Sequence, residues 1–159
     1  MTGLRVLTED DWRLWRELRL AALADAPDAF GSRLADWQNA AEEAWRSRLA
    51  MPGSRNLVAE TDGRPAGMAS GVPTGDPAAR ELIAMWVHPQ ARGRGVADAL
   101  IDAVASWART EGAEQLRLTV YEHNTAAALL YRRNGFTDIA PPGGAEPGVE
   151  RFMARPLAD

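Results

Sequence analysis

The sequence predicts an α/β (α+β) domain built around a mixed β-sheet. Strand-like and helix-like segments follow one another in the order β-α-α-β-β-β-α-β-α-β-β. The strand–helix–strand unit over residues 79–121 requires a parallel strand pair with a right-handed crossover. Hairpins on either side, one of them marked by Asp62-Gly63, make the other pairs antiparallel. A length of 159 residues favours a single domain over residues 1–159.

The first third of the chain predicts one strand and two helices. Residues 3–7 form the strand. Thr8 is then the expected helix N-cap, because three acidic residues follow it in what would be the first turn. Apolar residues at helical spacing continue that helix to about residue 25. A second helix is expected over 34–51, because apolar residues recur there every four positions until a Pro-Gly pair ends the pattern.

The remaining elements follow from changes in the apolar period. Strands are expected over 55–61, 65–72, 79–87 and 115–121, helices over 95–111 and 124–133, and a closing hairpin over 136–139 and 149–155. The loop 140–148 is rich in proline and glycine and is expected to be mobile. Simple alternation along 79–87 places Glu81 on the same face as Met85 and Val87.

Composition excludes several classes of protein. The net charge of −4 argues against nucleic acid as a partner. No apolar run is long enough to span a membrane, and the N-terminus lacks the build of a signal peptide, so a cytoplasmic location is expected. Without cysteine or lysine there is no disulfide, thiol nucleophile or lysine Schiff base. His88 and His123 stand alone, so no metal site is predicted.

The most informative segment is residues 87–97, V-H-P-Q-A-R-G-R-G-V-A. A strand ends there, a glycine-rich turn follows, and a helix begins. Unpaired amides at such a turn form an anion site, and Gly93 and Gly95 let a phosphate approach the backbone closely. The segment is neither a Walker loop nor a dinucleotide turn, because the residues those motifs need are missing. A plain glycine-rich connection is the competing interpretation.

A second segment, residues 124–136, reads N-T-A-A-A-L-L-Y-R-R-N-G-F. Asn124 and Tyr131 are two helical turns apart and share a face on which the residues between them are small. An extended ligand could lie along that face. In isolation, a buried tyrosine and an asparagine that caps a helix explain the pattern better than a ligand site does.

Together the two segments resemble the GNAT superfamily of N-acetyltransferases. Its R/Q-x-x-G-x-G/A turn is similar to residues 92–97, and its N-x-x-A-x-x-x-Y-x-x-x-G-F pattern is similar to residues 124–136. The resemblance implies helices on both faces of a mostly antiparallel sheet whose central parallel strands, 79–87 and 115–121, splay apart. Acetyl-CoA would bind between them as co-substrate, without a metal. A homodimer is possible on the same ground.

The resemblance also assigns cofactor-binding residues. The pantetheine arm would pair with the strand edge at Met85, Trp86 and Val87 and meet Asn124. Tyr131 would lie near the sulfur. The pyrophosphate would rest on the turn whose residues are Arg92, Gly93, Arg94, Gly95, Val96 and Ala97.

The expected reaction is attack of a neutral amine on the thioester. Tyr131 can give a proton to the leaving thiolate, and a backbone N–H near residues 85–87 can stabilise the oxyanion. Glu81 is the candidate base, because it is an acid within an apolar strand. A solvent-exposed Glu81 paired with an arginine is equally plausible.

Two further functions compete with catalysis. The chain could be a binding or sensory module that keeps an acyl-CoA cleft without turnover, or a nucleotide-phosphate binder. The acceptor stays open among small amines, antibiotics, protein N-termini and protein lysines. It is expected to enter beside the first two helices, the loop 25–33 and the loop 140–148.

Overall fold

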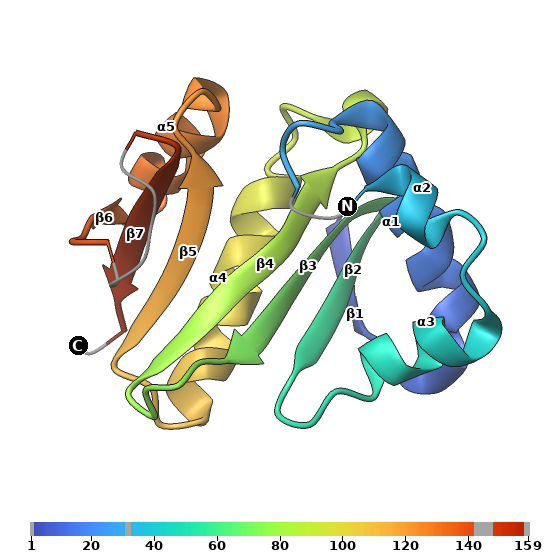
Figure 1. Cartoon of the computed structure of the whole chain (residues 1–159), viewed down its shortest axis with the longest axis horizontal. Coiled ribbons are helices and arrows are strands. Elements are labelled where there is room, and N and C mark those ends of the chain that lie inside the picture. The colour runs from blue at the N-terminus through green and yellow to red at the C-terminus, as the bar shows by residue number, and fades with distance from the viewer. Residues whose placement is uncertain (1, 31–32, 142–147, 158–159) are drawn as a thin grey trace.

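A mixed sheet runs through the computed structural model of the chain, which describes residues 2–30, 33–141 and 148–157. Within these residues the sheet has seven strands in the order β1-β2-β3-β4-β5-β7-β6 (Figure 1). The strands are β1 (Thr2–Val6), β2 (Arg55–Thr61), β3 (Arg64–Pro73), β4 (Ala79–Val87), β5 (Gln115–Tyr121), β6 (Thr137–Asp138) and β7 (Glu150–Pro156). Only β4 and β5 pair in parallel among the described strands, which confirms the predicted mixed, mostly antiparallel sheet.

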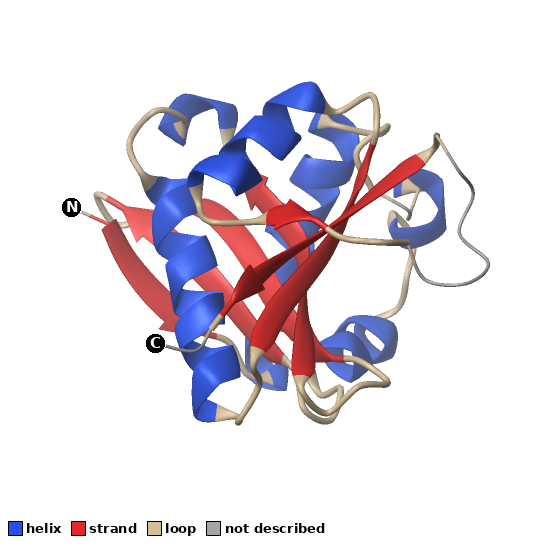
Figure 2. Cartoon of the chain, turned by 90° about the vertical axis from the view of Figure 1, so that its left-hand side faces the viewer, coloured by secondary structure: helices blue, strands red, loops and turns tan. Residues whose placement is uncertain are grey.

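Helices cover both faces of the sheet, as predicted (Figure 2). They are α1 (Trp12–Asp25), α2 (Leu34–Trp37), α3 (Glu42–Leu49), α4 (Val96–Thr110) and α5 (Thr125–Arg133). One hydrophobic core joins α4 and α5 to the sheet, and a second joins α1 and α3 to the opposite face. Strand β4 contributes to both cores, with Leu82 on the α4 side and Trp86 on the α1 side.

The predicted helix over 34–51 is wrong in one respect, because it is two helices. Residue Ala41 is extended (φ −73°, ψ 158°) and serves as the N-cap of α3. In one continuous helix Trp37 and Trp45 would be displaced by about 12 Å along the axis. Instead the ring centroids of Trp37 and Trp45 are 4.8 Å apart, so the break lets two aromatic rings pack together.

The other elements agree with the sequence to within a few residues. Thr8 caps the 3₁₀ turn Glu9–Asp11 that leads into α1, and Asp62-Gly63 forms the β2–β3 turn with positive φ at both residues. The closing hairpin is present, although β6 is shorter than expected and pairs with β7 rather than with the centre of the sheet. Most of the loop 140–148, expected to be mobile, lies outside the described residues.

Candidate active site

The two central strands splay apart, as the resemblance implied. Strand β4 pairs with β5 only through its first three residues, and the last pair is Glu81 with Arg117. Beyond it the two strands diverge (Figure 1). From Leu82 onward, no described strand pairs with the β5-facing edge of β4, so its backbone groups are available to a ligand.

A β-bulge interrupts β4 inside this opening. Met68 of β3 pairs with Trp86 and Ser70 pairs with Ile83, so three steps along β4 oppose two along β3. The extra residue falls at Ala84, whose φ of 55° is unusual for a residue with a side chain. A non-glycine residue in that region costs on the order of 1–2 kcal/mol, which the surrounding packing must offset.

The bulge corrects the predicted alternation of β4. Met85 and Val87 pack against the core that also holds Leu82 and faces α4. Glu81 lines a pocket on the other side, beneath α1 and α3. The prediction that Glu81 shares a face with Met85 and Val87 is therefore wrong, because one inserted residue reverses every side chain that follows it.

The glycine-rich turn has the backbone conformation that an anion site requires. Gly93 and Gly95 have φ of 80° and 79°, and nothing lies within 4 Å of where a Cβ would be at either position. Gly95 is the N-cap of α4 and supplies no side-chain cap. The first amides of α4 therefore have no side-chain acceptor from their own N-cap, and the helix dipole adds positive potential to them.

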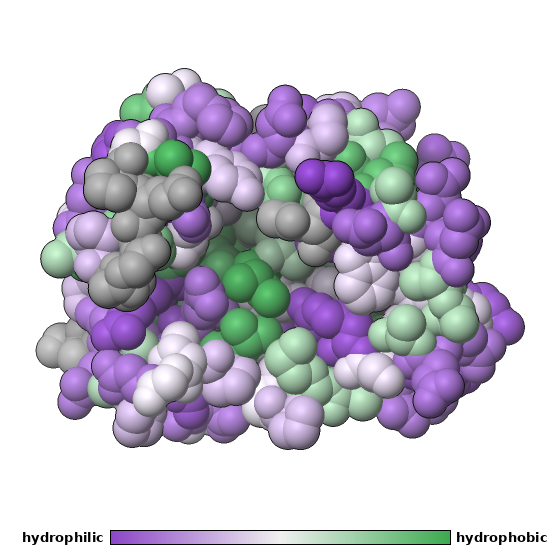
Figure 3. Space-filling model, in the orientation of Figure 1, coloured by the Kyte–Doolittle hydropathy of each residue, from purple (hydrophilic) through white to green (hydrophobic). Residues whose placement is uncertain are grey.

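The turn, the end of β4 and α5 enclose a cleft of about 590 Å³. Figure 3 shows that the face turned to the viewer in Figure 1 is hollowed near its centre, with hydrophobic residues in the hollow. Most predicted cofactor-binding residues line the cleft. They are Met85, Trp86, Val87, Arg92, Gly93, Gly95, Val96, Ala97, Asn124 and Tyr131. Arg94 is exposed and lines a different hollow with His88 and Gln90.

An ionic contact joins the turn to the end of α1. Asp25 accepts a hydrogen bond from Trp86 Nε1 at 3.0 Å and another from an Arg92 Nη at 2.6 Å. The hydrogen bonds from Trp86 and Arg92 lower the pKa of the Asp25 carboxyl. Arg92 also donates from Nε to the carbonyl oxygen of Val87 at 3.1 Å. Its side chain therefore braces the turn, and the backbone there is left to meet a ligand.

Asn124 and Tyr131 lie at the two ends of one face of α5. The side-chain oxygen of Asn124 accepts from the backbone N–H of Ala127 at 3.2 Å, so this residue is also a helix cap. Tyr131 is 9% exposed and its ring packs edge-on against Phe136. Burial raises the pKa of Tyr131 to about 12, so the phenol is protonated at neutral pH.

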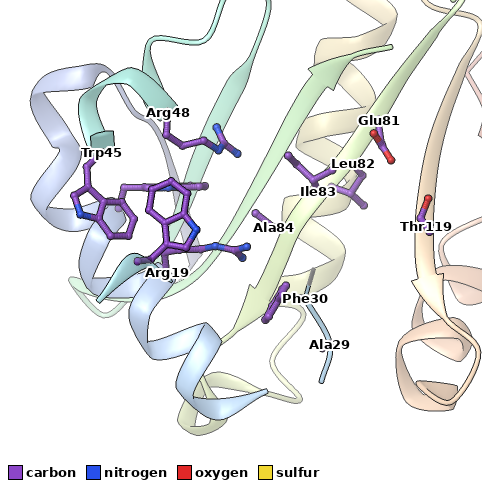
Figure 4. A pocket seen from close by; sticks show the side chains of 12 residues that line it. Arg19, Ala29, Phe30, Trp45, Arg48, Glu81, Leu82, Ile83, Ala84 and Thr119 are labelled. Carbon is purple, nitrogen blue, oxygen red and sulfur yellow. The ribbon is translucent and has the colours of Figure 1, made fainter. Parts of the chain in front are cut away.

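Glu81 lies in a second, smaller pocket of about 290 Å³ (Figure 4). The structure therefore does not place the two predicted catalytic residues in one hollow. The two hollows adjoin, because Ala29 and Phe30 line both. Burial raises the pKa of the Glu81 carboxyl, in the direction that a general base needs.

Two residues of this second pocket, Arg19 and Arg48, were not predicted from the sequence. Each is next to an apolar residue of its helix stripe, which was the only available signal. Acceptor entry was expected beside the loops 25–33 and 140–148. Phe30 of the first loop lines the pocket, whereas residues 31–32 and 142–147 lie outside the described part of the chain.

Among the described residues, neither a metal-binding cluster nor a membrane-spanning helix is present. No group of three or more acidic or histidine side chains there could hold a metal ion. Within 2–30, 33–141 and 148–157, none of the helices has the length and apolar character needed to cross a bilayer.

Similarity to known proteins decides the family. The model of the acetyltransferase (GNAT) family matches residues 11–136, which include both motif segments. The chain belongs to the GNAT family. Its relatives include the IAA acetyltransferase of Azospirillum brasilense, which is 32% identical over 111 residues, covering 69% of this chain and 72% of the relative.

Other similarities of this GNAT chain are partial or structural. The mycothiol acetyltransferase of Beutenbergia cavernae is 31% identical over 134 residues, covering 84% of this chain but 43% of that protein. The chain thus spans less than half the length of this relative. A Salmonella typhimurium structure described as an acetyltransferase with its cofactor acetyl-CoA is 25% identical, with a TM-score of 0.76 over 100% of this chain and 95% of that one. A Streptococcus pneumoniae GNAT acetyltransferase shares the fold, with a TM-score of 0.79 and 20% identity over 99% of this chain and 100% of that one.

Proposed function

We propose that this GNAT chain transfers the acetyl group of acetyl-CoA to an amine. The observation that carries the proposal is the cleft between β4 and α5, which has the glycine-rich turn and the first amides of α4 at one end and a protonated phenol inside it. The similar Salmonella typhimurium protein, solved with acetyl-CoA, supports the choice of co-substrate.

The residues present fit the pantetheine arm and the pyrophosphate of acetyl-CoA. The open edge of β4 from Leu82 to Val87 offers backbone groups for the pantetheine amides. The amides of Gly93, Gly95 and the start of α4 offer donors for the pyrophosphate. Small side chains, Ala126 and Ala127, leave room along α5 beside Asn124.

The chain's residues can then serve each step of acetyl transfer. The amine nitrogen forms a bond to the thioester carbon, and the carbonyl oxygen takes up negative charge. Backbone N–H groups beside the bulge at Ala84 and Met85 are candidates to stabilise that charge. The carbon–sulfur bond then breaks, the thiolate takes a proton from Tyr131, and the amine proton passes to Glu81, directly or through water.

The environment of each titrating group agrees with its proposed role. A phenol whose pKa is raised to about 12 carries its proton at neutral pH, as a general acid must, and it can donate that proton as negative charge builds up on the sulfur during carbon–sulfur cleavage. Among the described residues, no hydrogen bond engages the Tyr131 hydroxyl, so its proton is not committed elsewhere. Half-buried Glu81 is the weaker assignment, because it lies in the adjoining pocket rather than in the cleft.

The alternative is an acyl-CoA-binding module without turnover. Release of free thiol from acetyl-CoA in the presence of a panel of amines separates the two, with acetyl-CoA binding measured by calorimetry in parallel. Amine-dependent thiol release supports the enzyme, whereas tight binding with no release for any amine supports the module. A homodimer and a cytoplasmic location remain predictions from the sequence.

A further inference from the structure

The second pocket contains two arginine side chains among aromatic rings. Arg19 extends from α1 and Arg48 from α3, both toward β4 (Figure 4). Three tryptophans and Phe30 form the apolar walls, and the residues next to the bulge form the far side. The tryptophans are Trp15, Trp37 and Trp45, and the bulge residues are Ile83 and Ala84.

Arg48 is held in place by a buried polar network. Its two Nη nitrogens donate to Asn56 Oδ1 at 3.0 Å and to Ser70 Oγ at 3.1 Å, and Ser70 donates to Asn56 at 2.7 Å. Asn56 and Ser70 are 2% and 0% exposed. The guanidinium also lies 5.3 Å from the centre of the Trp15 ring. A side chain fixed by so many contacts is pre-organised to bind a ligand.

Arg19 has no such partners within the described part of the chain. Its guanidinium lies 4.6 Å from the centre of the Phe30 ring, and one Nη is buried without a hydrogen-bond acceptor. Burial, and secondarily the charge of Arg48, lower the pKa of Arg19 to about 10. No described carboxylate lies within salt-bridge distance of either arginine.

Two neighbouring cations in a partly desolvated pocket are unfavourable without an anion. A planar carboxylate matches the guanidinium fork and would neutralise this charge. Glu81 lines the same pocket, so it disfavours a doubly charged anion more than a singly charged one. The aromatic walls favour an apolar carbon skeleton between the charged ends.

We propose that this pocket binds the carboxylate of the acceptor, which is therefore an amine of amino-acid type with an apolar or aromatic side chain. This inference rests on the proposed acetyl transfer. Arg19 and Arg48 bind the carboxylate, and the amine points toward Glu81 and the bulge, where the pocket adjoins the cleft. An amine without a carboxylate leaves both arginines uncompensated.

The first test measures binding without turnover. The protein, with CoA present, is titrated with N-acetyl-L-phenylalanine, N-acetyl-L-leucine or N-acetylglycine and, separately, with the carboxamide of each. Tryptophan fluorescence is the readout, and the affinity of each acid is compared with that of its amide. Three tryptophans line the pocket and report on occupancy. A carboxylate that binds about tenfold or more tightly than its amide is expected, as for a hydrogen bond to a charged group. Equal affinities, or no binding of any carboxylate, overturn the proposal.

The second test uses matched variants of α1. Arg19→Met keeps the apolar stem and removes the charge, whereas Arg13→Met makes the same change at an exposed position on the same helix. The carboxylate preference is expected to disappear in Arg19→Met, to persist in Arg13→Met and to survive partly in Arg19→Lys. Preference unchanged in folded Arg19→Met contradicts the proposal. If Arg19→Met does not fold, Arg19→Lys and the ligand pairs still decide the question.

Kinetics with free amino acids and their amides separate this proposal from acetyl transfer itself. If acetyl-CoA binds and amino acids are acetylated at least tenfold faster than their amides, both the proposed acetyl transfer and the proposed carboxylate site are supported. If amides or simple amines are preferred, acetyl transfer stands and the carboxylate site falls. If carboxylates bind but no amine is acetylated, the proposed function fails while the site remains.

Discussion

The cleft between β4 and α5 and the pocket beneath α1 and α3 differ in what forms their walls. In the cleft, the groups offered to the proposed ligand are mainly backbone groups, which come from an unpaired strand edge and from the glycine turn at the start of α4. The pocket is made of side chains from separate elements, including Arg19, Arg48 and Trp45. A backbone-built site needs particular residues at fixed spacing, whereas a side-chain site needs only that distant residues pack together.

The bulge at Ala84 is where the two regions meet. Ala84 lines the pocket, and the next residue, Met85, lines the cleft. In the proposed acetyl transfer each region supplies a different group, the Tyr131 phenol from the cleft and the Glu81 carboxylate from the pocket. Removing each group separately tests whether the two regions divide the chemistry in this way.

The largest effect is expected from the cleft. Tyr131→Phe keeps the ring and its packing on Phe136 but removes the proton. Acid catalysis contributes about 10²–10⁴-fold, so kcat should fall by that order with little change in acetyl-CoA affinity. Tyr121, the other tyrosine of the chain, provides the matched control, and Tyr121→Phe should leave kcat nearly unchanged. Full turnover in Tyr131→Phe, where chemistry limits the rate, would reduce Tyr131 to a packing residue.

A smaller effect is expected from the pocket. Glu81→Gln removes the charge at nearly constant volume, and kcat/KM at neutral pH should fall by about tenfold or more. The amine is mostly protonated at that pH and would then lack its base. Activity should recover at high pH, where the amine deprotonates unaided. A pH–rate profile of both proteins with the same amine measures this.

The control for that profile is Glu60→Gln, the same change at a half-buried strand position in β2. Its profile should coincide with that of the unchanged protein. If the Glu81→Gln profile coincides as well, Glu81 is a bystander and the pocket contributes binding only. The division of chemistry between the two regions would then be wrong, although the carboxylate site would be untouched.

The same contrast explains which parts could be predicted from sequence. The order of elements followed from periodicity, whereas the splayed parallel pair and the cleft residues followed from the family resemblance that the two motifs carry. Such motifs exist because backbone geometry constrains residue types there. The bulge could not be predicted, since Ala84 is neither the glycine nor the asparagine that usually marks positive φ. Arg19 and Arg48 gave no pattern, because only the packing of α1 against α3 brings them to one pocket.

The smallest effect tests whether the turn acts through its backbone. Gly95 and Gly112 flank the two ends of α4, are both exposed, and have φ of 79° and 87° with open space where a Cβ would lie. An alanine at either position meets the same unfavourable left-handed conformation. Gly95→Ala and Gly112→Ala should therefore lose similar stability, about 1–2 kcal/mol each in urea unfolding.

Their affinities for CoA should nevertheless differ. The Cβ at Gly95 would stand where the pyrophosphate is expected and would disturb the first amides of α4, whereas Gly112 is at the far end of the helix. Partial loss of one hydrogen bond to a charged ligand corresponds to about threefold to tenfold in affinity. Calorimetric titration with CoA should show that loss for Gly95→Ala alone. Affinities for CoA that are unchanged in both variants would mean that the pyrophosphate does not contact the backbone of this turn. Equal losses would trace the effect to general destabilisation of α4 rather than to contact with the ligand.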